Sequence, residues 1–135
     1  MSDPTCDGQT RGVVVARVLE DRPHPMAQRI RLATIDLGGS KQQVVYGGRL
    51  VLTPGQFVPA ALPGARLPGR KKMRCRRYHG ESSYGMVCSS DELGWTTGGP
   101  DEVAILDPEL MLEPGQSLDE ADERWLLRVA EVVAR

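Results

Sequence analysis

The sequence predicts an all-β fold, a small barrel or sandwich built from short strands. Fifteen Gly and ten Pro interrupt the chain often, whereas two Trp, three Tyr and one Phe supply few large core residues. Between these breaks lie short segments that are β-branched or that alternate polar and apolar residues. With 135 residues, the chain is long enough for one domain with its own core and a short appendage.

Three strands are expected in the first third of the chain. Residues 13–19 are a β-branched run, which should end before the Pro-His-Pro sequence that follows because proline has no amide hydrogen for a sheet ladder. Residues 29–37 alternate in polarity as a barrel strand does. A Gly-Gly pair then predicts a tight turn, and residues 41–46 are expected to return as the second strand of a hairpin.

Further strands are expected at residues 57–62, 70–78 and 103–106, and short helical turns at residues 26–28 and 91–94. In a strand over 70–78, alternate side chains point to opposite faces. One face would then carry a row of four cations, and the other would turn Met73 and Cys75 toward the core. The four are Arg70, Lys72, Arg74 and Arg76.

The end of the chain has a different pattern. Apolar residues recur at helical spacing through residues 117–135, and Ser117 with Glu120 fits a capping box. The sequence therefore predicts an amphipathic helix, either packed on the barrel or available to a partner or a second copy. The expected organisation is a flexible segment at 1–12, a domain at 13–116 and a helix at 117–135.

Charge is segregated along the chain, although the formal net charge is only −1. No acid interrupts the basic side chains between positions 66 and 77, and residues 91–123 contain carboxylates but no Lys or Arg. Two interpretations stay open: two solvated faces of opposite sign, or a basic surface that binds a polyanion. The basic residues are Arg66, Arg70, Lys71, Lys72, Arg74, Arg76 and Arg77.

Catalytic and metal-binding chemistry has little support in the sequence. His24 lies between two prolines, where it is expected to fix a loop, and His79 is distant from it in the chain. Cys75, His79 and Cys88 do not follow the spacing of a standard zinc site. We therefore expect no enzyme activity, no cofactor and no metal, and three cysteines that stay reduced.

Location can also be inferred from what the sequence lacks. No apolar run approaches the roughly 18 residues of a membrane span. The first residues are polar and acidic and do not follow the pattern of a secretory signal. A cytoplasmic protein is expected.

Four motifs follow one another in order along the chain. They are His24-Pro25-Met26-Ala27, Asp36-Leu37-Gly38-Gly39, Ala61-Leu62-Pro63-Gly64-Ala65 and Ser83-Tyr84-Gly85-Met86-Val87-Cys88-Ser89-Ser90-Asp91-Glu92-Leu93-Gly94. Together they resemble the tRNA-binding OB-fold domain found near the N-terminus of the bacterial phenylalanyl-tRNA synthetase β chain and in free-standing tRNA-binding proteins. The resemblance extends from about Val13 to about Leu118. Leu50 and His79 depart from it, because the family carries Asn and Arg at these positions.

The resemblance implies a five-stranded OB-fold barrel that binds tRNA or another structured RNA through its backbone and shape, without catalysis. It places Ser83 and Tyr84 beside the RNA, although Gly85 and Met86 of the same motif also suit a tight turn that closes the barrel end. With the basic run, the predicted RNA-binding residues are Arg70, Lys71, Lys72, Arg74, Arg76, Arg77, Ser83 and Tyr84.

A second interpretation is a protein-interaction module. Such a module would be related to the synthetase domain but would have lost RNA binding, and it would dock through the acidic segment and the terminal helix. Leu50, His79 and the near-zero net charge favour it. The expected partners are therefore tRNA or another structured RNA, with a second copy of the chain or a synthetase as further candidates.

Overall fold

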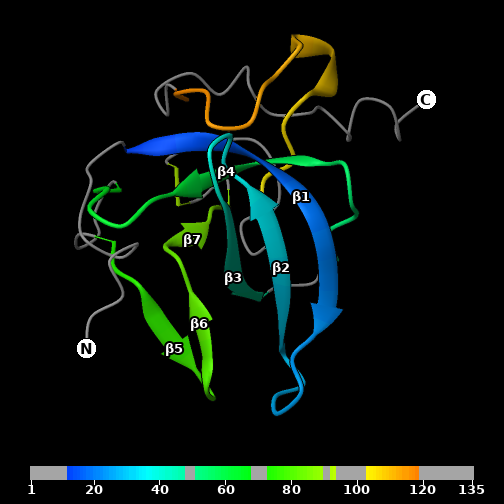
Figure 1. Ribbon diagram of the computed structural model, residues 1–135, viewed down its shortest axis with the longest axis vertical. Coiled ribbons are helices and arrows are strands. Elements are labelled where there is room, and N and C mark those ends of the chain that lie inside the picture. Colours follow the sequence, from blue (N-terminus) through cyan, green and yellow to red (C-terminus); the bar gives the residue numbers. More distant parts are fainter. Residues whose placement is uncertain (1–11, 48–50, 68–72, 90–91, 94–102, 119–135) are drawn as a thin grey trace.

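The computed structural model describes residues 12–47, 51–67, 73–89, 92–93 and 103–118 of the chain (Figure 1). A short 3-10 helix, η2 (Pro108–Leu110), follows the strands. In chain order, the strands are β1 (Val13–Pro23), β2 (Ile30–Asp36), β3 (Lys41–Gly47), β4 (Phe57–Ala61), β5 (Arg76–Tyr78), β6 (Glu81–Ser83) and β7 (Met86–Val87). This part of the chain contains no helix with the length and hydropathy of a membrane span.

Five of the strands form one antiparallel sheet with the order β3-β2-β1-β4-β7. β5 and β6 pair with each other in a separate two-stranded sheet, which lies below β7 in Figure 1. The prediction of a mostly β chain with a five-stranded sheet is confirmed. The β5–β6 hairpin was not predicted, since no strand was expected at residues 81–83.

The first half of β1 is buried on both faces. Val14 lies in an inner cluster with Ile35, whereas Val15 lies in a second cluster with Leu106 and Leu118. This segment pairs with β4 on one side. On the other side, residues 115–118 run antiparallel to it, with an isolated bridge between Val14 and Ser117. Coverage on both faces explains why residues 13–16 are all apolar and do not alternate with polar residues.

β1 is longer than predicted and continues to Pro23. Its pairing with β2 shifts register between Val18 and Glu20, which is a β-bulge or similar irregularity. Since a one-residue slip moves side chains to the opposite face, Asp21 is placed opposite Ala33 of the inner cluster. Pro23 is tolerated because it stands at the very end of the strand.

Contacts between the two edges of the sheet bring β3 close to the β6–β7 connection. The Tyr84 amide donates a hydrogen bond to the Gln43 carbonyl oxygen (2.9 Å). The Val45 amide donates to Ser83 Oγ (2.9 Å). The five-stranded sheet is therefore curled, and its edge strands are linked by way of residues 83 and 84.

Several other predicted elements differ from the structure. Residues 26–28 form bends and not a helical turn, and residues 103–106 form isolated bridging contacts and not a strand. The predicted helical turn at 91–94 is an exception, because in its described residues 92–93 the Leu93 amide bonds to the Ser89 carbonyl oxygen, four residues back, as in one turn of an α-helix. Ser117, the predicted helix cap, is extended beside β1. The rest of the predicted helix, 119–135, and the segment 1–11 lie outside the described residues.

Candidate nucleic-acid interface

The β5–β6 hairpin presents the basic residues of this region. Its register pairs Arg76 with Ser83, Arg77 with Ser82 and Tyr78 with Glu81. The two residues between the strands, His79 and Gly80, have φ angles of 51° and 87°, as the tightest hairpin turns require. Every residue of β5 is exposed.

The predicted strand over residues 70–78 is wrong in its length, because only Arg76–Tyr78 is a strand among the described residues 73–78. The Met73 amide bonds to the Ala65 carbonyl oxygen and its own carbonyl accepts from the Gly64 amide. The chain therefore changes its pairing partner between 73 and 76, which ends any continuous ladder. Arg70, Lys71 and Lys72 lie outside the described residues.

Because the strand is shorter than predicted, the expected row of four cations along one face is not formed by the described residues. Arg74 is exposed but precedes β5. Within β5, Arg76 and Arg77 are neighbours, so their side chains leave opposite faces of the hairpin. The described cations are thus spread around the hairpin and do not form one line.

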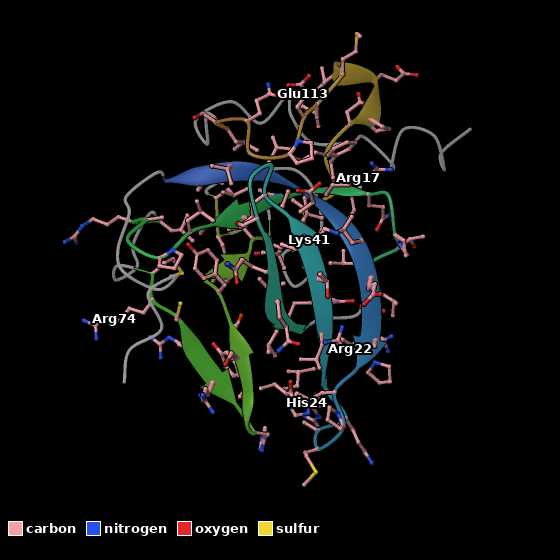
Figure 2. The ribbon with its side chains drawn as sticks, in the orientation of Figure 1. Arg17, Arg22, His24, Lys41, Arg74 and Glu113 are labelled. Carbon is pink, nitrogen blue, oxygen red and sulfur yellow. The ribbon has the colours of Figure 1, made fainter. Side chains whose placement is uncertain are left out.

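None of these cations is neutralised by a described carboxylate. The ion pairs among the described residues are Arg22 with Glu20 (3.8 Å) and Arg31 with Asp21 (2.6 Å). Figure 2 shows Glu113, beyond η2, at the end of the molecule opposite His24, whereas Arg74 lies on the hairpin side. The charge segregation seen in the sequence is therefore also a separation in space between the described basic and acidic segments.

A network of hydrogen-bonded side chains holds the hairpin against the sheet. Arg22 Nη2 donates to Gln43 Oε1 (2.6 Å), and Arg22 Nη1 donates to Thr34 Oγ1 (3.4 Å). Gln43 Nε2 in turn donates to the Ser82 carbonyl oxygen (2.9 Å) and to Glu81 Oε1 (3.2 Å). Neither Arg22 nor Gln43 was predicted from the sequence, since neither stands in a motif or in the basic run.

His24 connects the loop between β1 and β2 to the same hairpin. The residue is 5% exposed, and its Nε2 lies 2.7 Å from the Tyr78 carbonyl oxygen. Nδ1 accepts a hydrogen bond from the Met26 amide (2.9 Å). The ring also meets His79 edge-on, with 5.9 Å between centroids. His24 therefore fixes a loop, as the sequence predicted, and it also contacts the hairpin, which the sequence did not show.

Ser83 and Tyr84, which the motif predicts beside the RNA, both make contacts within the protein. Ser83 is 1% exposed, and its hydroxyl accepts from the Val45 amide while donating to the Gly85 carbonyl oxygen (3.0 Å). Both hydrogen-bonding functions of this hydroxyl are thus used inside the protein. Tyr84 is half-buried against the inner cluster. The structure shows both residues joining β3 to the β6–β7 connection.

A partly buried polar cluster joins β1, β2 and β3 near the β1–β2 loop. Asp21 accepts two hydrogen bonds from Arg31 through Oδ2 (2.9 and 2.6 Å) and one from the Tyr46 hydroxyl. That hydroxyl also accepts from the Leu52 amide (3.0 Å). Burial and the bond to Asp21 raise the pKa of Tyr46 to about 12. The bond to Asp21 likewise raises the pKa of Arg31, so this cation is neutralised internally.

The cysteines differ in part from the expectation of reduced thiols. Cys75 is disulfide-bonded, which corrects that expectation for this residue. Folding can bring together cysteines that are widely spaced in sequence, and spacing alone does not reveal this. Cys88 is a fully buried thiol, as expected of a small apolar core residue.

Comparison with known proteins gives a consistent result. Residues 13–117 match the model of a family described as "Putative tRNA binding domain". The chain is 40% identical over 109 residues to the phenylalanine–tRNA ligase β subunit of Symbiobacterium thermophilum, covering 81% of this chain and 12% of that protein. It is 43% identical over 83 residues to the corresponding subunit of Methylococcus capsulatus, covering 62% of this chain and 10% of that protein.

The chain therefore spans about an eighth of the length of the curated relatives it matches. The family model covers well over half of this chain, and it begins where β1 begins and ends where residues 115–118 return beside that strand. The chain belongs to the tRNA-binding domain family, homologous to the tRNA-binding region of phenylalanine–tRNA ligase β subunits.

Proposed function

We propose that this chain binds tRNA, or another structured RNA, without catalysing a reaction on it. The observation that carries the proposal is the β5–β6 hairpin, whose exposed arginines have no carboxylate partner among the described residues. RNA is a polyanion, and a protein binds it first by releasing counterions from phosphates with its own cations. The family to which the chain belongs supports the same conclusion.

We propose that the curled five-stranded sheet belongs to a complete OB-fold barrel. Support comes from the strand order β3-β2-β1-β4-β7 and from the hydrogen bonds that link β3 to residues 83 and 84. OB-folds bind nucleic acids on the face of their second and third strands, between the loops that follow the first and fourth strands. Here these loops are the β1–β2 loop, with His24, and the β4–β7 connection, with the basic hairpin.

The proposed interface therefore combines two segments. Exposed arginines at positions 74, 76 and 77 flank one side, and exposed Arg29 lies in the loop on the other. We keep Arg70, Lys71 and Lys72 as proposed phosphate contacts. Ser83 and Tyr84 belong to the proposed site as residues that hold its geometry. Since Tyr78 is the one exposed Phe, Tyr or Trp side chain among the described residues, recognition would depend on backbone and shape more than on base stacking.

We propose that the domain binds tRNA in the cytoplasm. It would do so alone, beside a synthetase or as a homodimer. The predicted helix at 117–135 would supply the partner surface. An RNA-binding module that lacks catalytic groups would contribute affinity and orientation to such an assembly.

Replacing Arg76 and Arg77 together by Gln tests the proposal. We expect this change to lower affinity for total tRNA about tenfold at low salt. It should also reduce the slope of log K against log salt by about 2, because two phosphate contacts are lost. The measurement is a fluorescence titration at several salt concentrations between roughly 50 and 200 mM.

The matched control replaces Arg17 and Lys41 by Gln. These exposed cations lie away from the hairpin (Figure 2), and the change in net charge is the same. Equal losses in the two double variants would show that only overall charge matters, which contradicts the proposed interface. Melting curves establish that both variants are folded.

One observation favours the second candidate function, a protein-docking module. Leu110 and Met111 are 45% and 87% exposed beside acidic residues, and Met111 has a φ angle of 55°. Exposed apolar side chains on a protruding turn suit a protein partner better than RNA. If the wild-type chain shows no affinity for tRNA but forms a dimer or a protein complex through this turn, the docking function replaces the first proposal.

A further inference from the structure

We propose that His24 is a positioning residue that latches the β1–β2 loop to the β5–β6 hairpin, so that the two segments form one preorganised RNA interface. This inference rests on the proposed function, and it adds a role for a side chain that need not touch RNA. It is motivated by the two hydrogen bonds of a nearly fully buried imidazole.

The partners of the ring determine its protonation state. The Met26 backbone amide can only donate, so Nδ1 of His24 must be the acceptor. The Tyr78 carbonyl oxygen can only accept, so Nε2 must carry the proton. The ring is thus the neutral Nε2–H tautomer, and each nitrogen has a separate task. Nδ1 shapes the loop, whereas Nε2 reaches a residue 54 positions away in the chain.

The two strands of the hairpin are held by different side chains. On β6, Gln43 bonds to the Ser82 carbonyl oxygen and to Glu81 Oε1, and the Ser83 hydroxyl bonds to the Val45 amide. On β5, His24 bonds to Tyr78, the last residue before the turn. Losing the bond from His24 would leave β6 attached through Gln43 and Ser83 but would free β5 to move beside the turn. Its arginines would keep their charge and lose their fixed placement.

Such a loss has a distinct signature in binding. A mobile hairpin can still reach phosphates, so the number of counterions released, and with it the salt slope, stays the same. Affinity falls at every salt concentration because ordering the hairpin now opposes binding. A positioning role therefore predicts a lower affinity with an unchanged salt slope, unlike the Arg76 and Arg77 double variant.

Two substitutions separate the tasks of the two nitrogens. In His24→Asn, the side-chain oxygen can take the place of Nδ1 and accept from the Met26 amide, but the side chain is too short to reach Tyr78. In His24→Gln, the terminal amide can take the place of Nε2 and donate to the Tyr78 carbonyl oxygen. The first variant keeps the local turn and loses the latch, and the second keeps the latch.

The experiment measures total-tRNA affinity and amide hydrogen exchange of the hairpin for the wild-type chain and both variants. We expect His24→Asn to weaken binding about three- to tenfold with an unchanged salt slope, as for the loss of one hydrogen bond. Hairpin exchange should become faster in this variant. His24→Gln should bind within about twofold of the wild-type chain and protect the hairpin as well as it does.

The failures of the two proposals can be told apart. If the wild-type chain does not bind tRNA, the proposed function fails, and hairpin exchange alone decides whether the latch exists. Unchanged exchange in His24→Asn overturns the latch. Equal weakening by both variants also overturns it, because keeping the bond to Tyr78 would then make no difference to binding. A reduced salt slope in His24→Asn would show lost phosphate contacts and likewise contradict a pure positioning role.

Discussion

Buried and half-buried polar side chains join distant segments of this protein. Ser83, Gln43 and His24 each bond to a main-chain group of another segment, 38 to 54 residues away along the chain. Sequence reasoning predicted a loop-fixing role for His24 from its flanking prolines. It could not place Ser83, because a serine hydroxyl has the same chemistry whether it meets RNA or a buried amide, and only the fold decides between them.

Tyr46 gives a prediction at the residue scale. Its raised pKa of about 12, against an ordinary value of 10.0, means that the folded state keeps the phenol proton that the unfolded chain releases. The resulting stability is complete below about pH 10 and is lost as the pH rises toward 12. We expect the free energy of unfolding to fall by roughly 1–2 kcal/mol across this interval from Tyr46 alone.

The measurement is urea unfolding at a series of pH values for the wild-type chain and Tyr46→Phe. The variant should be less stable at neutral pH, because its Asp21 and Leu52 partners lose a hydrogen bond. Its stability should decline less steeply between pH 10 and 12. Parallel declines in the two proteins would show that Tyr46 keeps no proton by folding.

At the scale of elements, strands with strong local patterns were predictable and those defined by tertiary pairing were not. The alternating segment at 29–37 and the hairpin return at 41–46 correspond closely to β2 and β3. The β1 bulge and the short β5 depend on which distant residues pair with them, so no local pattern reports them. η2 did have a local signal, since Asp107 caps it and Pro108 occupies its first turn.

Gly85, which connects β6 to β7, gives the prediction at this scale. Its φ angle is +70°, and a Cβ atom there would lie 2.1 Å from the Ala61 carbonyl oxygen in β4. Gly85→Ala should therefore destabilise the protein by about 2–4 kcal/mol, through backbone strain and displacement of β4. Urea unfolding measures this change.

Gly39→Ala is the control for this substitution. Gly39 lies in the β2–β3 turn without a positive φ angle, and a Cβ atom there would meet no atom within 4 Å. This variant should stay within about 0.5 kcal/mol of the wild-type chain. A comparable cost for the two substitutions would mean that the close approach of Gly85 to β4 is not what constrains the connection.

For the whole molecule, the separation of charge matters more than its sum. A net charge of −1 suggests no preference for a polyanion, yet the described acidic residues around η2 and the described basic residues of the hairpin lie at different ends (Figure 2). Such an arrangement can orient the molecule as it approaches RNA. The order of charges in the sequence predicted the segregation, but only folding shows that the acidic turn leaves the hairpin arginines unpaired by described carboxylates.

The most direct test of the proposed interface is a map of backbone amide chemical shifts during titration of the isotope-labelled full chain with tRNA. The account predicts that the largest changes fall in β5, β6 and the β1–β2 loop, at residues 23–29 and 76–83, with little change around η2 at Pro108–Leu110. Changes centred on η2, or none at RNA concentrations that saturate the binding curve, would contradict it.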